Sequence, residues 1–335
     1  MGLPAPAAPR ARYARSGHER QTWQRELVKT GFIVAGAVLA LGVSALGVWA
    51  WAPDRSRSDL NIKYLRAADH FREVAGTTLR VRDSGPADGP VLLFLHGFAS
   101  SLETWEPWAR LLSAHYRVIR FDLPGCGLSP PDSMRNYGDA RSSSIIQALL
   151  DQMRVDRVVL VGNSLGGRIA WNFAAEFPAR VGKLVLISPD GFASPGFDYD
   201  KPPKIPAPLN LMKYFLPKTL LRQNLVSAYA DSSRLTEADV DRYYDLLLAS
   251  GNRAALIDRM QQTILRNPAP LLRQIHTPTL LMWGEKDRLI PYGNAADYLR
   301  ELPDATLVTF PELGHVPHEE APAESLPPLE RFLAQ

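Results

Sequence analysis

The chain has 335 residues, of which 46% are hydrophobic and 22% are charged, a composition that excludes an intrinsically disordered protein. The formal net charge of +3 is too small to predict nucleic acid as a partner. Cys126 is the only cysteine, so no intrachain disulfide can form, and we expect neither a metal nor a cofactor.

A basic arm leads into a long uncharged segment. Residues 1–30 carry six lysines and arginines against two glutamates, and no charged residue lies between Lys29 and Asp54. As a helix, residues 31–52 would be about 33 Å long, enough to cross the hydrocarbon core of a bilayer, which is about 30 Å thick. Two tryptophans near the far end suit an aromatic belt. We predict a transmembrane signal anchor over residues 31–52, with the bilayer as a partner.

A buried core helix and a cleaved signal peptide are the other interpretations of this segment. Ala50-Trp51-Ala52 loosely resembles an A-x-A cleavage site, but the apolar stretch exceeds the usual length of about 7 to 15 residues, and Pro53 would follow the cut. Positive charges set the predicted orientation. Five lie within about twenty residues on the N-terminal side and four on the far side: Arg12, Arg15, Arg20, Arg25 and Lys29, then Arg55, Arg57, Lys63 and Arg66. We predict a cytoplasmic N-terminus, with the rest of the chain outside the cytoplasm, in the periplasm if the source is bacterial.

After a predicted linker over residues 53–69, short apolar strands alternate with helices. An expected hairpin, REVAGTTLRVRDSG, comes first. Six further segments have the pattern of buried strands, each ended by a polar or glycine-containing turn: PVLLFLHG, YRVIRFDLPG, RVVLVGNS, KLVLISPD, TPTLLMWGEKD and ATLVTFPELGH. This alternation predicts a mainly parallel sheet covered on both faces, which we assign to residues 70–190 and 271–335. Residues 191–270 are too long for a plain loop and show helical patches, so we predict a helical cap.

The stretch VGNSLGG places Ser164 between Gly162 and Gly166. A G-x-S-x-G motif arises by chance in roughly 0.1 copies per chain of this composition, so its context must decide between a catalytic serine and a glycine-rich loop. A β-branched apolar run precedes the serine and an amphipathic helical segment, residues 165–177, follows it, as a nucleophile requires. We interpret Ser164 as a nucleophile on a strained turn whose small neighbours allow close backbone approach.

Two further candidates follow other strands. In an open parallel sheet, ligands bind beyond the carboxyl ends of the strands, so the residues just after each strand are informative. Asp287 follows the seventh strand and His315 follows the eighth. A nucleophile, an acid and a base therefore occur in the chain order Ser, Asp, His.

Five motifs in order carry a resemblance to a known family: HGF at residues 96–98, D-x-P-G-x-G-x-S at residues 122–129, GNSLGG, WGEKD followed by Pro291, and GH at residues 314–315. From about residue 70 to 335 the chain resembles an α/β-hydrolase of the capped esterase and lipase type. The resemblance implies an eight-stranded, mostly parallel α/β-hydrolase sheet with a helical cap, here preceded by one transmembrane helix.

The same resemblance implies a role for each candidate residue. Ser164 would attack the acyl carbon, His315 would take its proton, and Asp287 would orient the imidazole and stabilise its charge. The backbone N–H groups of Phe98 and Leu165 would form the oxyanion hole.

Other polar residues compete for these roles or lie near them. Asp190 is a rival acid because it follows the sixth strand, and His318 is a rival base three residues beyond His315. We expect His96 to orient its loop by hydrogen bonds. We expect Cys126 to pack rather than to react.

Five residues are candidates for the substrate pocket: Phe98, Asn163, Phe192, Phe215 and Val316. The predicted cap carries further aromatic rings, some of which would pack it to the core: Phe197, Tyr199, Tyr214, Tyr229, Tyr243 and Tyr244. This aromatic content indicates a small-molecule substrate with an apolar acyl or alcohol group.

The resemblance implies a serine esterase or lipase that cleaves apolar or lipid-like carboxylic esters through an acyl-enzyme. Haloalkane dehalogenases and epoxide hydrolases of this fold carry an aspartate nucleophile, so Ser164 excludes them. Hydrolases of carbon-carbon bonds, of the meta-cleavage-product type, use serine and remain an alternative, although they typically have a tryptophan where this chain has Val316. A catalytically inactive, membrane-tethered ligand-binding protein is the alternative of another class, although all three triad candidates are present.

Overall fold

The structure of the protein is a computed structural model that describes residues 2, 17–193 and 199–335. It consists of two compact units, Met1–Trp51 and Ala52–Gln335. Most of the predicted basic arm, and Phe197 of the predicted cap, lie outside the described residues.

The first unit contains helix α1 (Gly17–Ala50). Within Gln21–Ala50, a window of 18 residues has a mean hydropathy of 2.2 and no buried residue, so the helix is long and apolar enough to cross a membrane. The bounds of this helix differ from those of the predicted membrane segment, residues 31–52, at both ends. The helix begins well before residue 31, and Ala52 belongs to the second unit, where its N–H donates to the Tyr214 carbonyl. Pro53 disfavours helical backbone at the residue before it, which explains why α1 does not continue to residue 52.

The segment predicted as a linker, residues 53–69, is built into the second unit. Helix α2 (Arg57–Tyr64) is capped by the Ser56 hydroxyl and buries Leu60. Arg57 donates to the Leu128 carbonyl and to the Asn252 side chain. These partners are distant in sequence, so tertiary contacts rather than local pattern order the segment.

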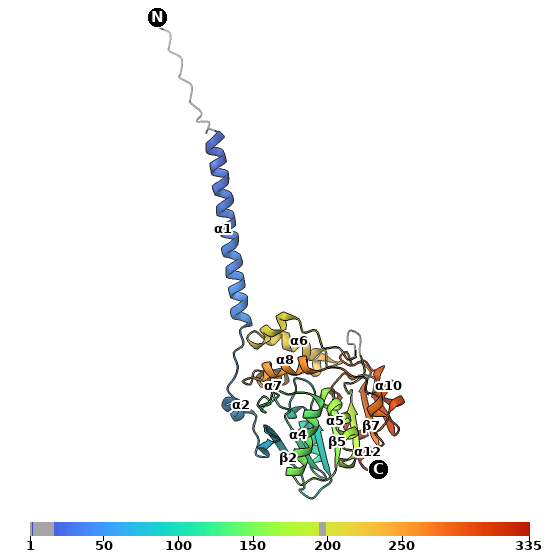
Figure 1. Cartoon of the computed structure of the whole chain (residues 1–335). Coiled ribbons are helices and arrows are strands. Elements are labelled where there is room, and N and C mark those ends of the chain that lie inside the picture. The colour runs from blue at the N-terminus through green and yellow to red at the C-terminus, as the bar shows by residue number, and fades with distance from the viewer. Residues whose placement is uncertain (1, 3–16, 194–198) are drawn as a thin grey trace. The chain divides into compact units, whose positions relative to one another are not determined.

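Eight strands form one sheet in the order β1-β2-β4-β3-β5-β6-β7-β8. The strands are β1 (Asp69–Val74), β2 (Thr77–Ser84), β3 (Val91–Leu95), β4 (Arg117–Phe121), β5 (Val158–Asn163), β6 (Val181–Ile187), β7 (Thr279–Gly284) and β8 (Ala305–Phe310). β2 runs antiparallel to both of its neighbours, and every other neighbouring pair is parallel. This confirms the predicted hairpin and the predicted α/β-hydrolase sheet (Figure 1).

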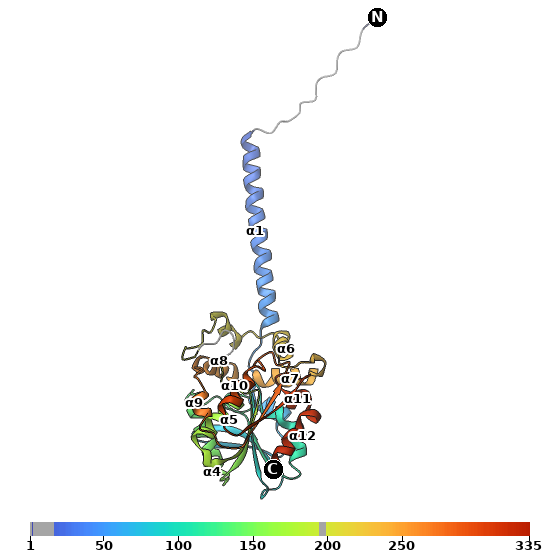
Figure 2. The ribbon, with the colours of Figure 1, turned by 90° about the vertical axis from the view of Figure 1, so that its right-hand side faces the viewer.

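Helices cover both faces of the sheet, which buries the apolar strands on each side. One layer consists of α4 (Asp139–Gln152), α5 (Leu165–Glu176), α9 (Ala269–Leu272) and α10 (Asn294–Glu301). The other consists of η1 (Leu102–Trp105), α3 (Glu106–Leu112), α11 (Pro317–Glu320) and α12 (Pro322–Leu333). Figure 2 shows α4, α5 and α9 on one side of the sheet and α11 and α12 on the other. The short η2 (Pro178–Arg180) connects α5 to β6.

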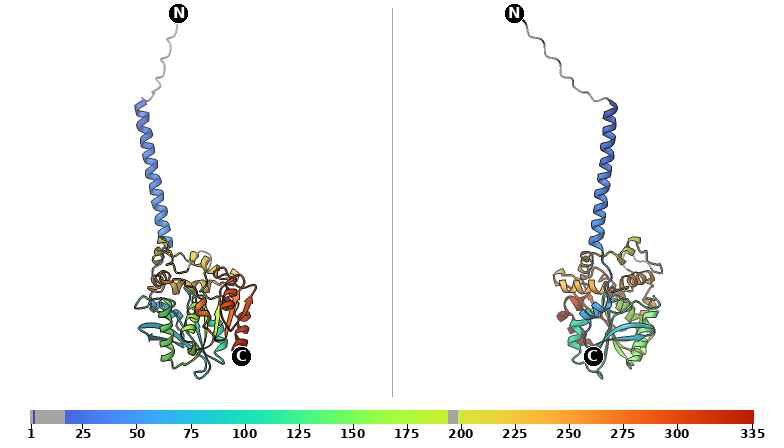
Figure 3. Two further views of the ribbon diagram at one scale, coloured as in Figure 1. Left: turned by 45° about the vertical axis from the view of Figure 1, so that its right-hand side comes forward. Right: turned by 90° about the vertical axis from the view of Figure 1, so that its left-hand side faces the viewer.

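A group of short helices lies between β6 and β7 in the chain. They are η3 (Ala207–Lys213), α6 (Lys218–Val226), η4 (Ser232–Arg234), α7 (Glu237–Leu247) and α8 (Asn252–Gln262). Figures 1 and 3 show α6, α7 and α8 together at one end of the sheet. They contact the loops that follow the strands: the Asn252 amide donates to the Gly127 carbonyl after β4, and the His315 N–H after β8 donates to the Ala228 carbonyl. These helices therefore cover the carboxyl edge of the sheet.

Candidate active site

Ser164 sits on a sharp turn between β5 and α5. Its backbone has φ 55° and ψ −120°, a strained conformation for a residue with a side chain. The flanking glycines allow the turn to form. A Cβ on Gly162 would lie 2.3 Å from the Gly166 carbonyl oxygen, and a Cβ on Gly166 would lie 2.2 Å from the Leu95 carbonyl oxygen. Steric crowding therefore requires glycine at both positions, as the motif predicts.

His315 and Asp287 are joined by a hydrogen bond of 2.8 Å between Nδ1 and Oδ2. The other carboxylate oxygen of Asp287 accepts from the N–H groups of Leu289 and Ile290, at 2.8 and 2.9 Å. Because an ionised carboxylate can only accept, Nδ1 carries the proton and leaves Nε2 as an acceptor. Both side chains are more than nine-tenths buried. The pair is thus fixed in the tautomer that a general base needs.

Asn163 ties the serine turn to the histidine loop. Its side-chain amide donates to the carbonyl oxygens of Ile187, at 3.1 Å, and of His315, at 3.0 Å. The residue beside Ser164 therefore contacts the backbone of His315 directly, which brings the two loops together. Asn163 is predicted as a pocket residue, but it is only 3% exposed. In this structure its side chain connects two loops by hydrogen bonds.

The loop after β3 approaches the serine from the other side. A Cβ on Gly97 would lie 3.3 Å from the Ser164 Cβ, so the chain next to Phe98 passes close to Ser164. His96 holds this loop: its Nδ1 donates to the Gly97 carbonyl at 2.8 Å, and its Nε2 accepts from the Leu123 N–H at 3.0 Å. Burial lowers the pKa of His96, which keeps the ring neutral. Leu165 is the first residue of α5, where backbone N–H groups lack helical partners.

The surroundings of Asp190, the rival acid, and of the Cys126 thiol differ from those of Asp287. The Asp190 carboxylate faces the Arg168 guanidinium at 3.6 Å rather than His315, and burial raises the pKa of this carboxyl group. Cys126 is buried, and burial raises the pKa of its thiol to about 11, so it stays protonated at neutral pH.

The rival base, His318, is part of the hydrophobic core. Its ring stacks on Trp105 with centroids 4.1 Å apart and lies edge-on to Trp108. Its Nε2 lies 3.1 Å from the Thr104 hydroxyl. It is fully buried, and burial lowers its pKa to about 3.

We predict that His318→Ala will lower stability but not catalysis. Loss of the stacked ring should cost about 3 kcal/mol of unfolding free energy, as for other buried aromatic truncations. The turnover number should stay within about threefold of the wild type, and the pH profile between pH 5 and 9 should keep its shape, since a group with a pKa of about 3 does not titrate there. Melting curves and a pH-rate profile measure both. His315→Ala is the matched comparison, and equal loss of turnover in the two variants would contradict the assignment.

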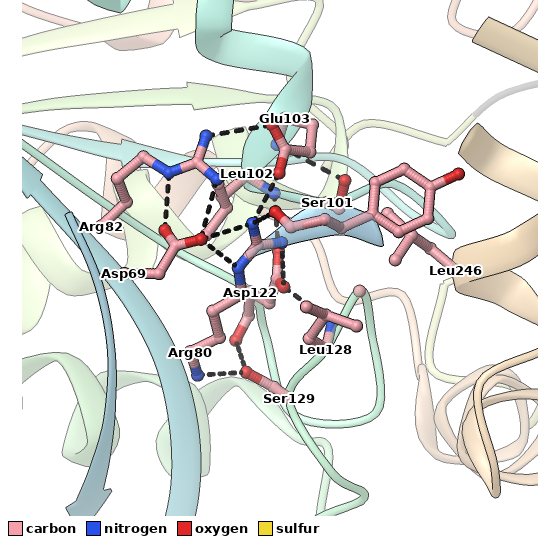
Figure 4. A network of polar contacts seen from close by, with 12 residues as sticks. Asp69, Arg80, Arg82, Ser101, Leu102, Glu103, Asp122, Leu128, Ser129 and Leu246 are labelled. Carbon is pink, nitrogen blue, oxygen red and sulfur yellow. Dashed lines mark hydrogen bonds and ion pairs between the residues drawn. The ribbon is translucent and has the colours of Figure 1, made fainter. Parts of the chain in front are cut away.

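A buried network of charges contacts the segment that follows the loop carrying Phe98 (Figure 4). Arg80, on β2, bonds or pairs with Asp69, Glu103 and Asp122, and all four side chains are less than a tenth exposed. Asp122 accepts from the Leu102 N–H at 2.7 Å. The network therefore links β1, β2 and the turn after β4 to the segment that follows the predicted oxyanion loop.

The predicted pocket residues are dispersed. Phe98 is 43% exposed, whereas Phe192 packs edge-on against Tyr298 in the core. Phe215 is partly buried, and Val316 packs among apolar residues such as Tyr229. The five predicted side chains thus have different surroundings.

A cavity of about 430 Å³ lies between the start of α4, α5 and the end of α8. Its lining includes Leu165 but none of the five predicted pocket residues. Its charged lining residues include Arg168 and Arg259, neither of which the sequence predicts as functional. A lone arginine in a helical segment gives no motif, and only the folded chain shows what it faces.

Comparisons with known proteins agree with this geometry. A family model described as alpha/beta hydrolase fold matches residues 90–322. A 2-hydroxy-6-oxo-6-phenylhexa-2,4-dienoate hydrolase from Burkholderia cepacia is 29% identical over 71% of this chain and 86% of its own length. A 2-hydroxy-6-oxononadienedioate/2-hydroxy-6-oxononatrienedioate hydrolase from Comamonas testosteroni is 30% identical over 77% of this chain and 92% of its own length.

Two solved structures are also similar. A membrane phospholipase A is 25% identical with a TM-score of 0.67, over 94% of this chain and 98% of its own. A meta-cleavage product hydrolase from Pseudomonas fluorescens IP01 is 21% identical with a TM-score of 0.68, over 79% of this chain and 97% of its own, and this likeness concerns the fold alone.

These relatives correct the predicted function. The predicted main activity, cleavage of apolar carboxylic esters, is wrong: the two curated relatives described above, at 29% and 30% identity, are hydrolases of 2-hydroxy-6-oxo compounds, the class of the carbon-carbon alternative. Val316, in place of the tryptophan that follows the catalytic histidine in such hydrolases, therefore does not exclude this class. The broader prediction of a hydrolase with this fold is confirmed.

Proposed function

The chain belongs to the alpha/beta hydrolase fold family, and from this premise we propose that it hydrolyses a carbon-carbon bond in 2-hydroxy-6-oxo-dienoates, with Ser164, His315 and Asp287 as its triad. The observation that carries the proposal is the match to such hydrolases over nearly their whole length. The hydrogen-bonded His315–Asp287 pair beside the strained serine supports it.

In the first proposed step, the Ser164 hydroxyl attacks the ketone carbon at position 6. His315 Nε2 takes the hydroxyl proton, and Asp287 stabilises the imidazolium that forms. The ketone oxygen becomes an alkoxide, which the N–H groups of Phe98 and Leu165 would stabilise. Preorganised donors of this kind are each worth about 3 kcal/mol of barrier.

In the second step, the bond between the former ketone carbon and the dienoate carbon breaks. Before the attack, the 2-hydroxyl group changes to its keto form by losing its proton while the carbon next to the ketone gains one from solvent. The electron pair of the broken bond then passes along the chain to the 2-keto oxygen, which gives an extended enolate. The imidazolium gives its proton to this enolate oxygen. Water, deprotonated by His315, then hydrolyses the acyl-serine. The sum is addition of one water across one carbon-carbon bond, giving a carboxylic acid and a 2-hydroxydienoate.

The test compares substrate classes with the full-length chain. Turnover of 2-hydroxy-6-oxo-6-phenylhexa-2,4-dienoate should exceed turnover of simple acyl esters by at least about 100-fold in kcat/KM, a difference in transition-state stabilisation of about 2.7 kcal/mol. Ester hydrolysis with no turnover of the dienoate would contradict the proposal.

We also propose that α1 anchors the chain in a membrane, with its N-terminus on the cytoplasmic side. The match to the membrane phospholipase A leaves 6% of 335 residues, about 20, unmatched, so it includes part of α1, which ends at Ala50. We predict that the intact 37.1 kDa chain stays in the membrane pellet after an alkaline carbonate wash. A shortened soluble chain would indicate a cleaved signal sequence instead. Protease added to spheroplasts should degrade the hydrolase unit, and protection until lysis would reverse the orientation.

A further inference from the structure

The turn that carries Phe98, the predicted oxyanion donor, is strained. The Ser100 N–H donates to the Gly97 carbonyl at 3.3 Å, which closes a β-turn. Ala99, the third residue of this turn, has a φ of 54°, in the left-handed region that is uncommon for a residue with a side chain. Strained backbone persists only where the surrounding structure fixes it. His96 holds the start of the turn by two hydrogen bonds, and the end of the turn therefore needs a contact of its own.

The end of the turn contacts α7, one of the helices that cover the carboxyl edge of the sheet. The Ser100 hydroxyl lies 3.2 Å from the hydroxyl of Tyr243, which in turn donates to Glu319 Oε2 at 2.7 Å. Because a hydroxyl has one proton and Tyr243 gives its proton to the carboxylate, Ser100 is the donor in the first contact. Burial and the charge of Glu319 raise the pKa of Tyr243, so its hydroxyl keeps this proton at neutral pH. The hydrogen bonds therefore run from Ser100 through Tyr243 to Glu319.

Glu319, on α11, is fixed by further partners. Its side chain is 7% exposed, and it accepts from the Thr104 hydroxyl, on η1, at 3.0 Å. Its other carboxylate oxygen pairs with Arg242, on α7, which compensates the buried charge. A buried polar network whose members are all paired is rigid, so Glu319 fixes the position of the Tyr243 hydroxyl.

The neighbouring carboxylate makes a corresponding connection to the histidine loop. Glu320 accepts from the Gly314 N–H at 2.7 Å and from the Asp231 N–H, between α6 and α7, at 2.9 Å. Gly314 directly precedes His315. Figure 2 shows α7 beside α11. Two consecutive glutamates of α11 therefore connect the covering segment to the His315 loop and to the Phe98 turn.

We propose that Tyr243 is a positioning residue for the reaction: its hydroxyl holds Ser100 and thereby the turn that presents the Phe98 N–H to the oxyanion. The inference rests on the part of the proposed function that assigns this N–H to the oxyanion hole, and not on which bond of the substrate is cleaved. The contact acts when negative charge develops on the substrate oxygen, so its loss should change kcat rather than KM. The oxyanion hole is then complete only while α7 lies against the turn.

The first experiment removes the hydroxyl and keeps the ring. In the full-length chain in detergent, Tyr243→Phe should lower kcat for the dienoate at least about tenfold and change KM less than about twofold. Tyr244→Phe is the matched control, because this hydroxyl, on the same helix, donates to the Leu216 carbonyl at 2.9 Å instead. Its kcat should stay within about twofold of the wild type. Equal kcat values for the two variants, or a rise in KM at unchanged kcat, would overturn the inference.

A double-variant cycle separates positioning from a general loss of stability. Ser100→Ala should lower kcat by about the same factor as Tyr243→Phe, and the combined variant should be less than about twofold worse than either, because both remove one contact. Ser100→Thr keeps a hydroxyl group and should retain kcat within about threefold. Factors that multiply in the combined variant would overturn the inference. If Tyr243→Phe does not fold, Ser100→Ala and Ser100→Thr decide the question, and equal kcat values for these two would overturn it.

A separate experiment does not need the dienoate. With a fluorophosphonate, the Ser164 oxygen bonds to phosphorus, fluoride leaves and His315 takes the proton. The phosphoryl oxygen enters the oxyanion hole, so the rate constant of labelling should fall at least about tenfold in Tyr243→Phe and stay within about twofold in Tyr244→Phe.

This labelling rate distinguishes the inference from the proposed function. An unchanged rate in Tyr243→Phe, with dienoate hydrolysis by the wild type, would overturn the role of Tyr243 and leave the proposed function intact. A rate that depends on Tyr243, without any dienoate hydrolysis, would overturn the proposed cleavage alone. A wild type that the fluorophosphonate does not label would overturn both.

Discussion

Ser164→Ala should lower the turnover number by about four to six orders of magnitude, because no other side chain can replace the attacking oxygen. Folding should persist, since alanine removes only the hydroxyl from a turn whose shape the flanking glycines allow. The measurement is kcat together with a melting curve. Ser188→Ala is a matched control. Ser188 also follows a strand, β6, with a positive φ of 42°, and its buried hydroxyl has no hydrogen-bond partner among the described residues.

The partners of Ser164 should rank in a definite order. His315→Ala should be nearly as harmful as Ser164→Ala, and Asp287→Asn should cost about 10⁴ in kcat, because an amide does not hold the imidazole in the required tautomer. Asp190→Asn should be much milder, since that carboxylate faces Arg168. The reverse ranking of the two aspartates would place the acid after β6 instead of β7.

Arg80→Met should cause the largest loss of stability among the variants considered. The substitution removes the positive charge of Arg80 but leaves the carboxylates of Asp69, Glu103 and Asp122 buried. Breaking a buried pair costs about 3–5 kcal/mol, which corresponds to a fall in melting temperature of roughly 10 °C. Arg117→Met is the control, because its pair with Asp83 is partly exposed and should contribute about 1 kcal/mol or less. Equal melting temperatures for the two variants would contradict the role of the network.

The network also predicts sensitivity to acid. Burial alone would raise the pKa values of Asp69 and Glu103, but hydrogen bonds and the charges of Arg80 and Arg82 outweigh it, so both pKa values are lowered. A lowered carboxylate pKa stabilises the fold above the unfolded value of about 4, and this contribution is lost as the pH falls below it. The melting temperature should therefore decrease between pH 5 and 3, and less steeply in Arg80→Met.

The sheet and the positions of the triad residues could be predicted because both depend on local pattern. Buried parallel strands are short apolar runs, and their carboxyl ends place Ser164, Asp287 and His315 at one edge. The network on β2 could not be predicted in this way. Arg80 and Arg82 alternate with apolar residues as if on a solvent face, yet both are buried, because their carboxylate partners come from β1, η1 and the turn after β4.

The ordered segment before β1 and the cavity were missed for the same reason. Arg57 is fixed by Leu128 and Asn252, and Arg259 is defined by a cavity between three helices, so neither has a signature in its own sequence. The sequence pattern also does not predict which bond of the substrate is cleaved. One triad can attack either an ester or a ketone carbonyl, and the leaving group that the pocket accepts decides between them.

Product analysis of the wild-type chain with 2-hydroxy-6-oxo-6-phenylhexa-2,4-dienoate in D₂O tests the central proposal most directly. Cleavage of the carbon-carbon bond should give one carboxylic acid and one 2-hydroxydienoate per dienoate consumed, with one solvent deuterium on the dienoate carbon at which the bond was broken. Ser164→Ala should give neither product. Recovery of the intact dienoate from a wild-type chain that releases acids from simple esters would contradict the proposal.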